Sequence, residues 1–169
     1  MNQNMNQIKY LSAFIVFTLI FQVSRAQNSI SVTERSSVSI DLSAIIAAGK
    51  NIEMVIDDSQ WINYSIELSP SETLASISVE IASGNIPNGM EFYMQAEHYT
   101  GSSRGKTGRT TGKIRVDHVP KVLINDIGTS NTGHGKHQGH QLILSMVITD
   151  FSLLQPGAYS LYIQYTLKQ

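Results

Sequence analysis

The chain has 169 residues, and its 12 Lys and Arg residues nearly balance its 13 Asp and Glu residues, so that the formal net charge at pH 7 is −1. This balance excludes the large positive surplus typical of proteins that bind nucleic acid or anionic membranes. Cysteine is absent, which excludes disulfide bonds, thiol catalysis and thiolate zinc sites.

The first residues follow the order of a secretory signal peptide. Lys9 precedes an apolar run over residues 11–21, and Ser-Arg-Ala at 24–26 places small residues at the −3 and −1 positions of a cleavage site. The run is shorter than the roughly 20 residues of a membrane-spanning helix. We therefore expect a cleaved signal peptide over residues 1–26 and a single domain over residues 27–169, without a further apolar segment long enough to span a membrane. The signal carries two of the 12 basic residues, so ten basic residues face 13 acidic ones in the mature chain.

Short segments typical of β-strands recur along the mature chain, with turn residues between them. In chain order, strands are expected over residues 29–32, 37–42, 51–56, 61–68, 74–81, 90–99, 113–119 and 122–127. Residues 43–49 are the one stretch with helical character. The Gly-rich, polar residues 100–112 and 128–141 are expected to form loops.

The C-terminal end predicts a strand, a tight turn and a second strand. Residues 141–151 are apolar on both faces of the pleat, as expected for a strand in the middle of a sheet. Gln155-Pro156-Gly157 supplies turn chemistry, since Pro fixes φ at one turn position and Gly accepts a positive φ at the next. Residues 159–168 then alternate between apolar and polar side chains. We expect a hairpin here, within an all-β, Ig-like antiparallel β-sandwich of about eight or nine strands.

Residues 27–42 form a candidate pairing arm. Apolar side chains alternate with polar ones along it, and these candidate subunit-pairing residues are Ile30, Val32, Val38, Ile40 and Leu42. Such an arm pairs either with an exposed edge strand of a neighbouring molecule or, as an ordinary first strand, within its own sheet. The sequence leaves both alternatives open.

Basic residues gather in and after the first Gly-rich loop. The candidate ligand-binding residues are Arg104, Lys106, Arg109, Lys113 and Arg115. Residues 101–107 resemble a phosphate-binding loop, but three residues separate the glycines where four are required, and a strand follows instead of a helix. The cluster either binds an acidic polysaccharide or anionic lipid head groups, or it is a solvated loop. Aromatic residues are not interleaved with the basic ones, so we expect no nucleic-acid partner.

Three histidines, His134, His137 and His140, recur every three residues in the second Gly-rich loop and are weak candidates for metal ligands. No carboxylate lies close by to orient the rings and Lys136 adds a positive charge, so an ordinary loop is the preferred interpretation. Neither G-x-S-x-G nor H-E-x-x-H occurs. We expect no metal, no cofactor and no enzymatic activity. Trp61 and Tyr99 are candidates for stacking on a sugar, with a core role for Trp61 as the simpler interpretation.

The sequence from Pro156-Gly157-Ala158-Tyr159 to Leu167 resembles the last strand of exported bacterial pilus-type subunits and spore-coat-U-like domains. The resemblance implies an Ig-like sandwich whose subunits are joined when an N-terminal extension of one fills a groove in the next. The chain differs from many of those subunits in having no cysteine for a disulfide.

The expected function is a non-enzymatic exported structural or surface subunit that forms a fibre or coat by β-strand addition. Its partners would be further copies of itself or related surface subunits, in the periplasm, on the cell surface or outside the cell. The alternative is a polysaccharide-binding β-sandwich module that uses the basic Gly-rich loop.

Overall fold

The computed structural model describes residues 28–33, 37–42 and 53–169. The expected signal peptide over residues 1–26 and the expected helical turns over residues 43–49 lie outside the described residues. The described part contains eleven strands and one short 3₁₀ helix. In chain order these are β1 (Ser29–Val32), β2 (Ser37–Asp41), β3 (Glu53–Asp57), β4 (Trp61–Ile66), β5 (Ala75–Ser83), β6 (Met90–Ala96), β7 (Gly105–Thr110), β8 (Ile114–Arg115), β9 (Lys121–Asn131), β10 (His140–Ile148), η1 (Phe151–Leu153) and β11 (Ala158–Lys168).

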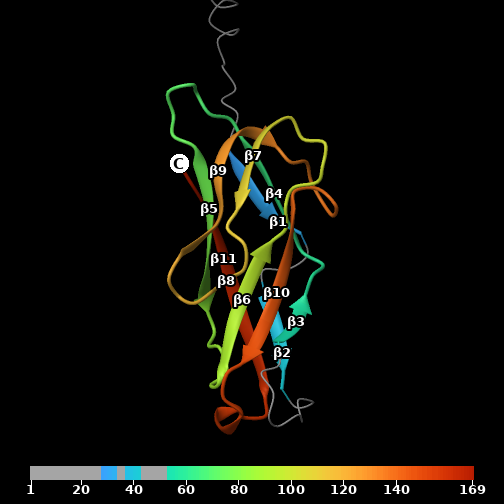
Figure 1. The fold of residues 1–169 in the computed structure, drawn as a ribbon, viewed down its shortest axis with the longest axis vertical. Coiled ribbons are helices and arrows are strands. Elements are labelled where there is room, and N and C mark those ends of the chain that lie inside the picture. The colour runs from blue at the N-terminus through green and yellow to red at the C-terminus, as the bar shows by residue number, and fades with distance from the viewer. Residues whose placement is uncertain (1–27, 34–36, 43–52) are drawn as a thin grey trace, which may run out of the picture.

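The all-β fold class is confirmed, and the strand pairs are antiparallel. Hydrogen bonds link the strands in the order β2-β11-β5-β9-β4-β10-β6-β8, with β1 joining β4, β3 joining β10 and β7 joining β9. In Figure 1, β6 and β10 cross in front of β11. The Tyr165 hydroxyl on β11 lies 3.7 Å from the Met94 sulfur on β6. The ends of the sheet therefore pack on each other as two layers of a sandwich.

The core between the layers follows from the alternation of the strands. On β5 the buried side chains include Ala75, Ile77, Val79 and Ile81, and on β6 they are Met90, Phe92, Met94 and Ala96. They belong to one apolar cluster together with side chains from β2, β4, β9, β10 and β11. Burying each large apolar side chain contributes about 1.5–3 kcal/mol, so a single continuous core holds the two layers together.

The predicted C-terminal hairpin is wrong. β10 is a central strand, as expected, but its neighbours are β6, β3 and, at its start, β4, whereas β11 pairs with β5 and β2. The connection through η1 and Gln155-Pro156-Gly157 therefore crosses from one layer to the other. The turn residues reverse the chain equally well in either arrangement, because their chemistry is local.

The expected loop over residues 100–112 is also wrong, because β7 lies within it and pairs with β9. Gly108 has φ +84, and a Cβ there would lie 2.7 Å from the Asn125 carbonyl oxygen. Asp126, on the facing part of β9, has φ 56, so the pairing is irregular where the chains approach closely. Conversely, the strand expected over residues 113–119 is limited to β8, and β9 continues to Asn131, into the second expected loop.

Among the described residues, no helix has the length and apolar character needed to cross a membrane.

Candidate functional site

The pairing arm lies against its own sheet in this chain. β1 pairs with β4, with Ile30 opposite Tyr64, and β2 pairs with β11, with Ile40 opposite Tyr159. The arm continues these pairings beyond the strands: the Leu42 amide donates to the Gly157 carbonyl oxygen at 3.1 Å. Of its two alternatives, pairing within the sheet is the one that the structure adopts.

The arm also completes the core. Val38, Ile40 and Leu42 are 4%, 5% and 6% exposed and belong to the central apolar cluster, while Ile30 and Val32 pack against it partly buried. Without this arm, the side chains that Val38, Ile40 and Leu42 cover would face water. The arm is therefore a structural element that the rest of the sandwich needs.

Several strands expose an unpaired edge within the described part of the chain. β2 pairs only with β11, β3 only with β10, and β7 only with β9. On β3, Val55 is 59% exposed, while Glu53 at the start of the strand forms an ion pair with Lys113. Charged side chains at such edges hinder uncontrolled pairing with other chains.

The structure separates the five basic candidates into two groups. Arg104 and Lys106 lie at the start of β7, beside β9, and make no ion pair with the described residues. Arg109 follows on β7 and lies 4.0 Å from Asp126. Lys113 and Arg115 lie at β8, which pairs with β6. The predicted basic cluster is thus divided between two parts of the sheet.

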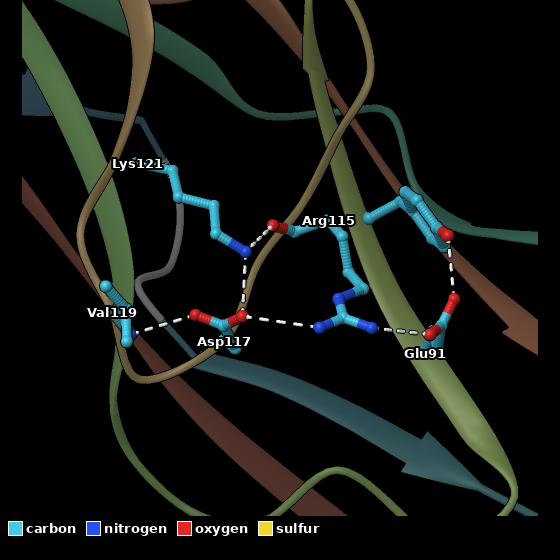
Figure 2. Close-up of polar contacts among 6 residues, drawn as sticks. Glu91, Arg115, Asp117, Val119 and Lys121 are labelled. Atoms are coloured by element: carbon cyan, nitrogen blue, oxygen red, sulfur yellow. Dashed lines mark hydrogen bonds and ion pairs between the residues drawn. The ribbon is translucent and has the colours of Figure 1, made fainter.

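Arg115 belongs to a network in which two carboxylates neutralise its charge (Figure 2). It contacts Glu91 at 2.7 Å and Asp117 at 3.8 Å. Lys121 lies 2.7 Å from the same Asp117 carboxylate. A hydrogen bond from Tyr93 and the contact with Arg115 lower the pKa of Glu91, and the hydrogen bond from Lys121 lowers the pKa of Asp117. The positive and negative side chains of this network therefore pair with one another, and we interpret the network as structural.

The three histidines are not brought together. His134 and His137 are exposed, and His137 lies against Trp61 with ring centroids 5.2 Å apart. His140 is 1% exposed at the start of β10. Within the described residues, no group of three or more His, Cys, Asp or Glu side chains is arranged to hold a metal ion.

His140 is instead the centre of a buried polar cluster. Two carbonyl oxygens flank the ring: that of Glu97 lies 2.8 Å from Nδ1, and that of Thr107 lies 3.2 Å from Nε2. A neutral imidazole has one N–H, which we place on Nδ1, at the shorter contact. Its Nε2 lies 2.9 Å from the Tyr64 hydroxyl oxygen, and that hydroxyl donates to the Thr107 carbonyl oxygen. The ring stacks on Tyr64 and tilts against Tyr99. Burial lowers the pKa of His140 and raises that of Tyr64, so both side chains are held neutral and serve packing.

The two aromatic candidates for sugar stacking, Trp61 and Tyr99, both contact other side chains of the domain. Trp61 lies against His137, and Tyr99, besides contacting His140, accepts a hydrogen bond from the Ser103 amide at 2.8 Å.

Sequence reasoning missed a pocket at the end of the sandwich where η1 lies. Its volume is about 480 Å³, and its walls come from the connections β5–β6, β8–β9 and β10–β11 together with the start of β11. The polar lining includes Asn85, Asn88, His118, Gln155 and Tyr159. In the sequence these residues mark turns, and no periodicity relates them, since the fold alone brings three separate connections together.

No match to this chain is found among protein-family models, curated proteins or solved structures.

Proposed function

We propose that this chain is a non-enzymatic, exported β-sandwich subunit of a surface assembly, in which residues 27–42 of one copy can replace the same residues of the next. The proposal rests on one observation. β2 is an edge strand whose apolar side chains complete the core of the domain.

The physical reason is that the core does not distinguish which copy supplies the arm. The contacts between Ile40 and the central cluster, and the pairing of β2 with β11, are identical when the arm comes from a neighbouring molecule. Exchange of the arm therefore keeps every native contact and joins one copy of the chain to the next. The resemblance of residues 156–167 to the last strand of pilus-type subunits supports this assembly mode, and the signal-like residues 1–26 support export.

The non-enzymatic part of the proposal is supported by the polar clusters, whose groups form hydrogen bonds and ion pairs within the domain. His140 is enclosed by Tyr64 and backbone carbonyl groups, and Arg115 is matched by Glu91 and Asp117. None of these groups is left ready to act on a substrate.

A cross-linking experiment tests the exchange. Ser39 on β2 faces Ser160 on β11 in the register, and both side chains are exposed. Directly opposed strand residues have Cα atoms within the range of about 4.4–6.8 Å that a disulfide bridges. Because the chain has no other cysteine, the double variant Ser39→Cys/Ser160→Cys reports arm pairing alone. We expect cross-linked monomers in dilute refolded samples and a ladder of cross-linked oligomers after refolding at high protein concentration.

The single variant Ser39→Cys is the matched control, because it cannot join the arm to β11 and yields at most dimers. Cross-linking confined to monomers at every protein concentration would contradict the exchange.

The alternative, polysaccharide binding through the basic loop, has weaker support. Arg109, Lys113 and Arg115 lie beside carboxylates, which leaves Arg104 and Lys106 as the residues with charge to offer. An affinity for acidic polysaccharide that falls with salt and is lost in the Arg104→Ala/Lys106→Ala variant would favour it.

A further inference from the structure

The pocket at the η1 end of the sandwich has the chemistry of a ligand site. It lies at the lower end of the molecule in Figure 1, where η1 is seen below β10. Its volume of about 480 Å³ falls within the range of roughly 300–1,000 Å³ that is usual for small-molecule sites. We propose that it binds a neutral saccharide unit.

The polar lining offers donors and acceptors without net charge. Asn85, Asn88 and Gln155 carry amide side chains, each with both a donor and an acceptor. None of these three amide groups has a hydrogen-bond partner among the described residues. Sugar hydroxyl groups likewise both donate and accept, so they match such a lining.

His118 adds an acceptor. Its Nδ1 lies 2.9 Å from the Ile81 carbonyl oxygen, and since a carbonyl only accepts, Nδ1 carries the proton. In the neutral ring, Nε2 is then left as an acceptor for a ligand.

Within the part of the chain that the structure describes, no charged group lines the pocket: none of these lining residues is Asp, Glu, Lys or Arg. Asp117, next to His118, is occupied by Lys121, by Arg115 and by the Val119 amide at 2.9 Å (Figure 2). An anionic or cationic ligand would find no counter-charge here, which favours a neutral one.

The apolar part of the lining suits the C–H face of a sugar ring. Ile86, Pro87 and Leu153 line the pocket together with Tyr159, and Leu153 is 52% exposed. An aromatic ring with an apolar body and a polar tip serves both faces of such a ligand. The Tyr159 hydroxyl donates to the Gln155 carbonyl oxygen at 3.2 Å, which fixes the ring against its own connection.

The walls of the pocket are tied together without a ligand. The Gly89 carbonyl oxygen accepts from the Thr149 amide at 2.8 Å and from the Asp150 amide at 3.1 Å. The Asp150 carboxylate in turn accepts from the Ser152 amide at 2.8 Å, at the start of η1. The β5–β6 and β10–β11 connections therefore hold each other, and little ordering is left to oppose binding.

The test is titration of the mature chain, residues 27–169, with glucose, galactose, mannose and N-acetylglucosamine and with their β-linked disaccharides, followed by ligand-observed NMR and calorimetry. We expect at least one of these sugars to bind with a Kd near or below about 1 mM. The variant Tyr159→Ala should weaken binding about tenfold or more. Gln155→Ala, at an exposed position where folding is not at risk, should weaken it in the same direction. Tyr162→Ala is the matched control, because Tyr162 lies on the same strand, is 54% exposed and is not part of the pocket.

The outcomes distinguish a free sugar from a glycan chain as the ligand, and they distinguish support for the proposal from its refutation. Binding of a free monosaccharide supports a soluble sugar as ligand, and binding of the disaccharides alone supports a glycan chain. Absence of binding at about 10 mM, ten times the expected Kd, overturns the proposal, and so does binding that Gln155→Ala and Tyr159→Ala leave unchanged. Preference for an acidic polysaccharide with strong salt dependence overturns it in favour of Arg104 and Lys106. The cross-link test of arm exchange is a separate readout, because neither Ser39 nor Ser160 lines the pocket.

Discussion

Replacing His140 by Phe should lower the stability of the domain by an amount that depends on pH. The Phe ring preserves the packing between Tyr64 and Tyr99, but it cannot donate to the Glu97 carbonyl oxygen, which the imidazole contacts at 2.8 Å. Leaving one such buried acceptor without a partner costs about 1–3 kcal/mol. The Tyr64 hydroxyl keeps its bond to the Thr107 carbonyl oxygen, so the loss is confined to that one group. At pH 8 we therefore expect the unfolding free energy to fall by about 1–3 kcal/mol.

The pH dependence follows from the lowered pKa of His140, which burial causes. Below the unfolded pKa of about 6.5, the unfolded chain takes up a proton at this histidine, whereas the folded chain resists protonation until the pH falls through its lower folded pKa. Stability is therefore fully present above pH 6.5 and is lost as the pH falls through that window, with a slope of at most about 1.4 kcal/mol per pH unit for one proton. The Phe variant lacks this contribution, so the gap between the two proteins should narrow on acidification.

Urea unfolding between pH 5 and pH 8, followed by far-UV circular dichroism, measures both effects. Carboxylates such as Asp117 and Asp150 have lowered pKa values, starting from 3.8, so they titrate below this range. The control is His134→Gln, an exposed position on the preceding connection, which should change stability by no more than about 0.5 kcal/mol. A gap between wild type and His140→Phe that stays constant from pH 8 to pH 5 would refute the reasoning.

Three further substitutions test the packing, the charges and the backbone. Ile40→Ala should lower the unfolding free energy by about 2–5 kcal/mol because it empties a core position, while exposed Ser39→Ala on the same strand should stay within about 0.5 kcal/mol; urea midpoints of the two variants decide this. Lys121→Met should cost no more than about 1 kcal/mol, since its ion pair is solvent-accessible, and the cost should shrink in high salt; a loss that persists in salt would show that the contact is not mainly electrostatic. Gly89→Ala should cost more than the roughly 1–2 kcal/mol of a positive φ alone, because its Cβ would lie 2.1 Å from the Asp150 carbonyl oxygen; an unchanged thermal midpoint would mean that the two connections move apart freely.

Strands with alternating apolar residues could be predicted from the sequence because burial enforces the alternation. On β6, Phe92 and Met94 face the core while the residues between them are partly exposed, and the same rule located β2, β4 and β5. The rule depends only on which face meets the core, so it does not report which strand lies beside which.

That limit explains the wrong hairpin. Pro156 and Gly157 predict a reversal of the chain, and the chain does reverse between β10 and β11. Whether the reversal joins neighbours in one layer or crosses to the other depends on competition for partners. β10 is already paired with β6, β3 and β4, and β11 with β5 and β2. Those pairings are set by segments far away in the sequence.

β7 could not be predicted because its stabilisation is in the backbone. Its sequence, Gly105 to Thr110, contains no apolar alternation, and it is held by pairing to β9. The spacing of the three histidines was misleading for a related reason. His134, His137 and His140 look equivalent by spacing, but only His140 falls on a strand that carries it into the core. For the pocket, the sequence predicts the turns that contain Asn88 and Gln155, but it does not predict that these turns lie side by side in the fold.

Arm exchange and saccharide binding meet on β11, where Tyr159 of the pocket lies opposite Ile40 of the arm. In an exchanged assembly the neighbouring copy supplies the same Ile40 contact, so the pocket keeps the same walls in the closed and exchanged forms. A ligand with equal affinity for two states shifts neither. A saturating sugar should therefore leave the share of intermolecular cross-links in the Ser39→Cys/Ser160→Cys variant unchanged. If the sugar raises or lowers that share, the two forms differ in affinity, and the arm must then take part in forming the pocket.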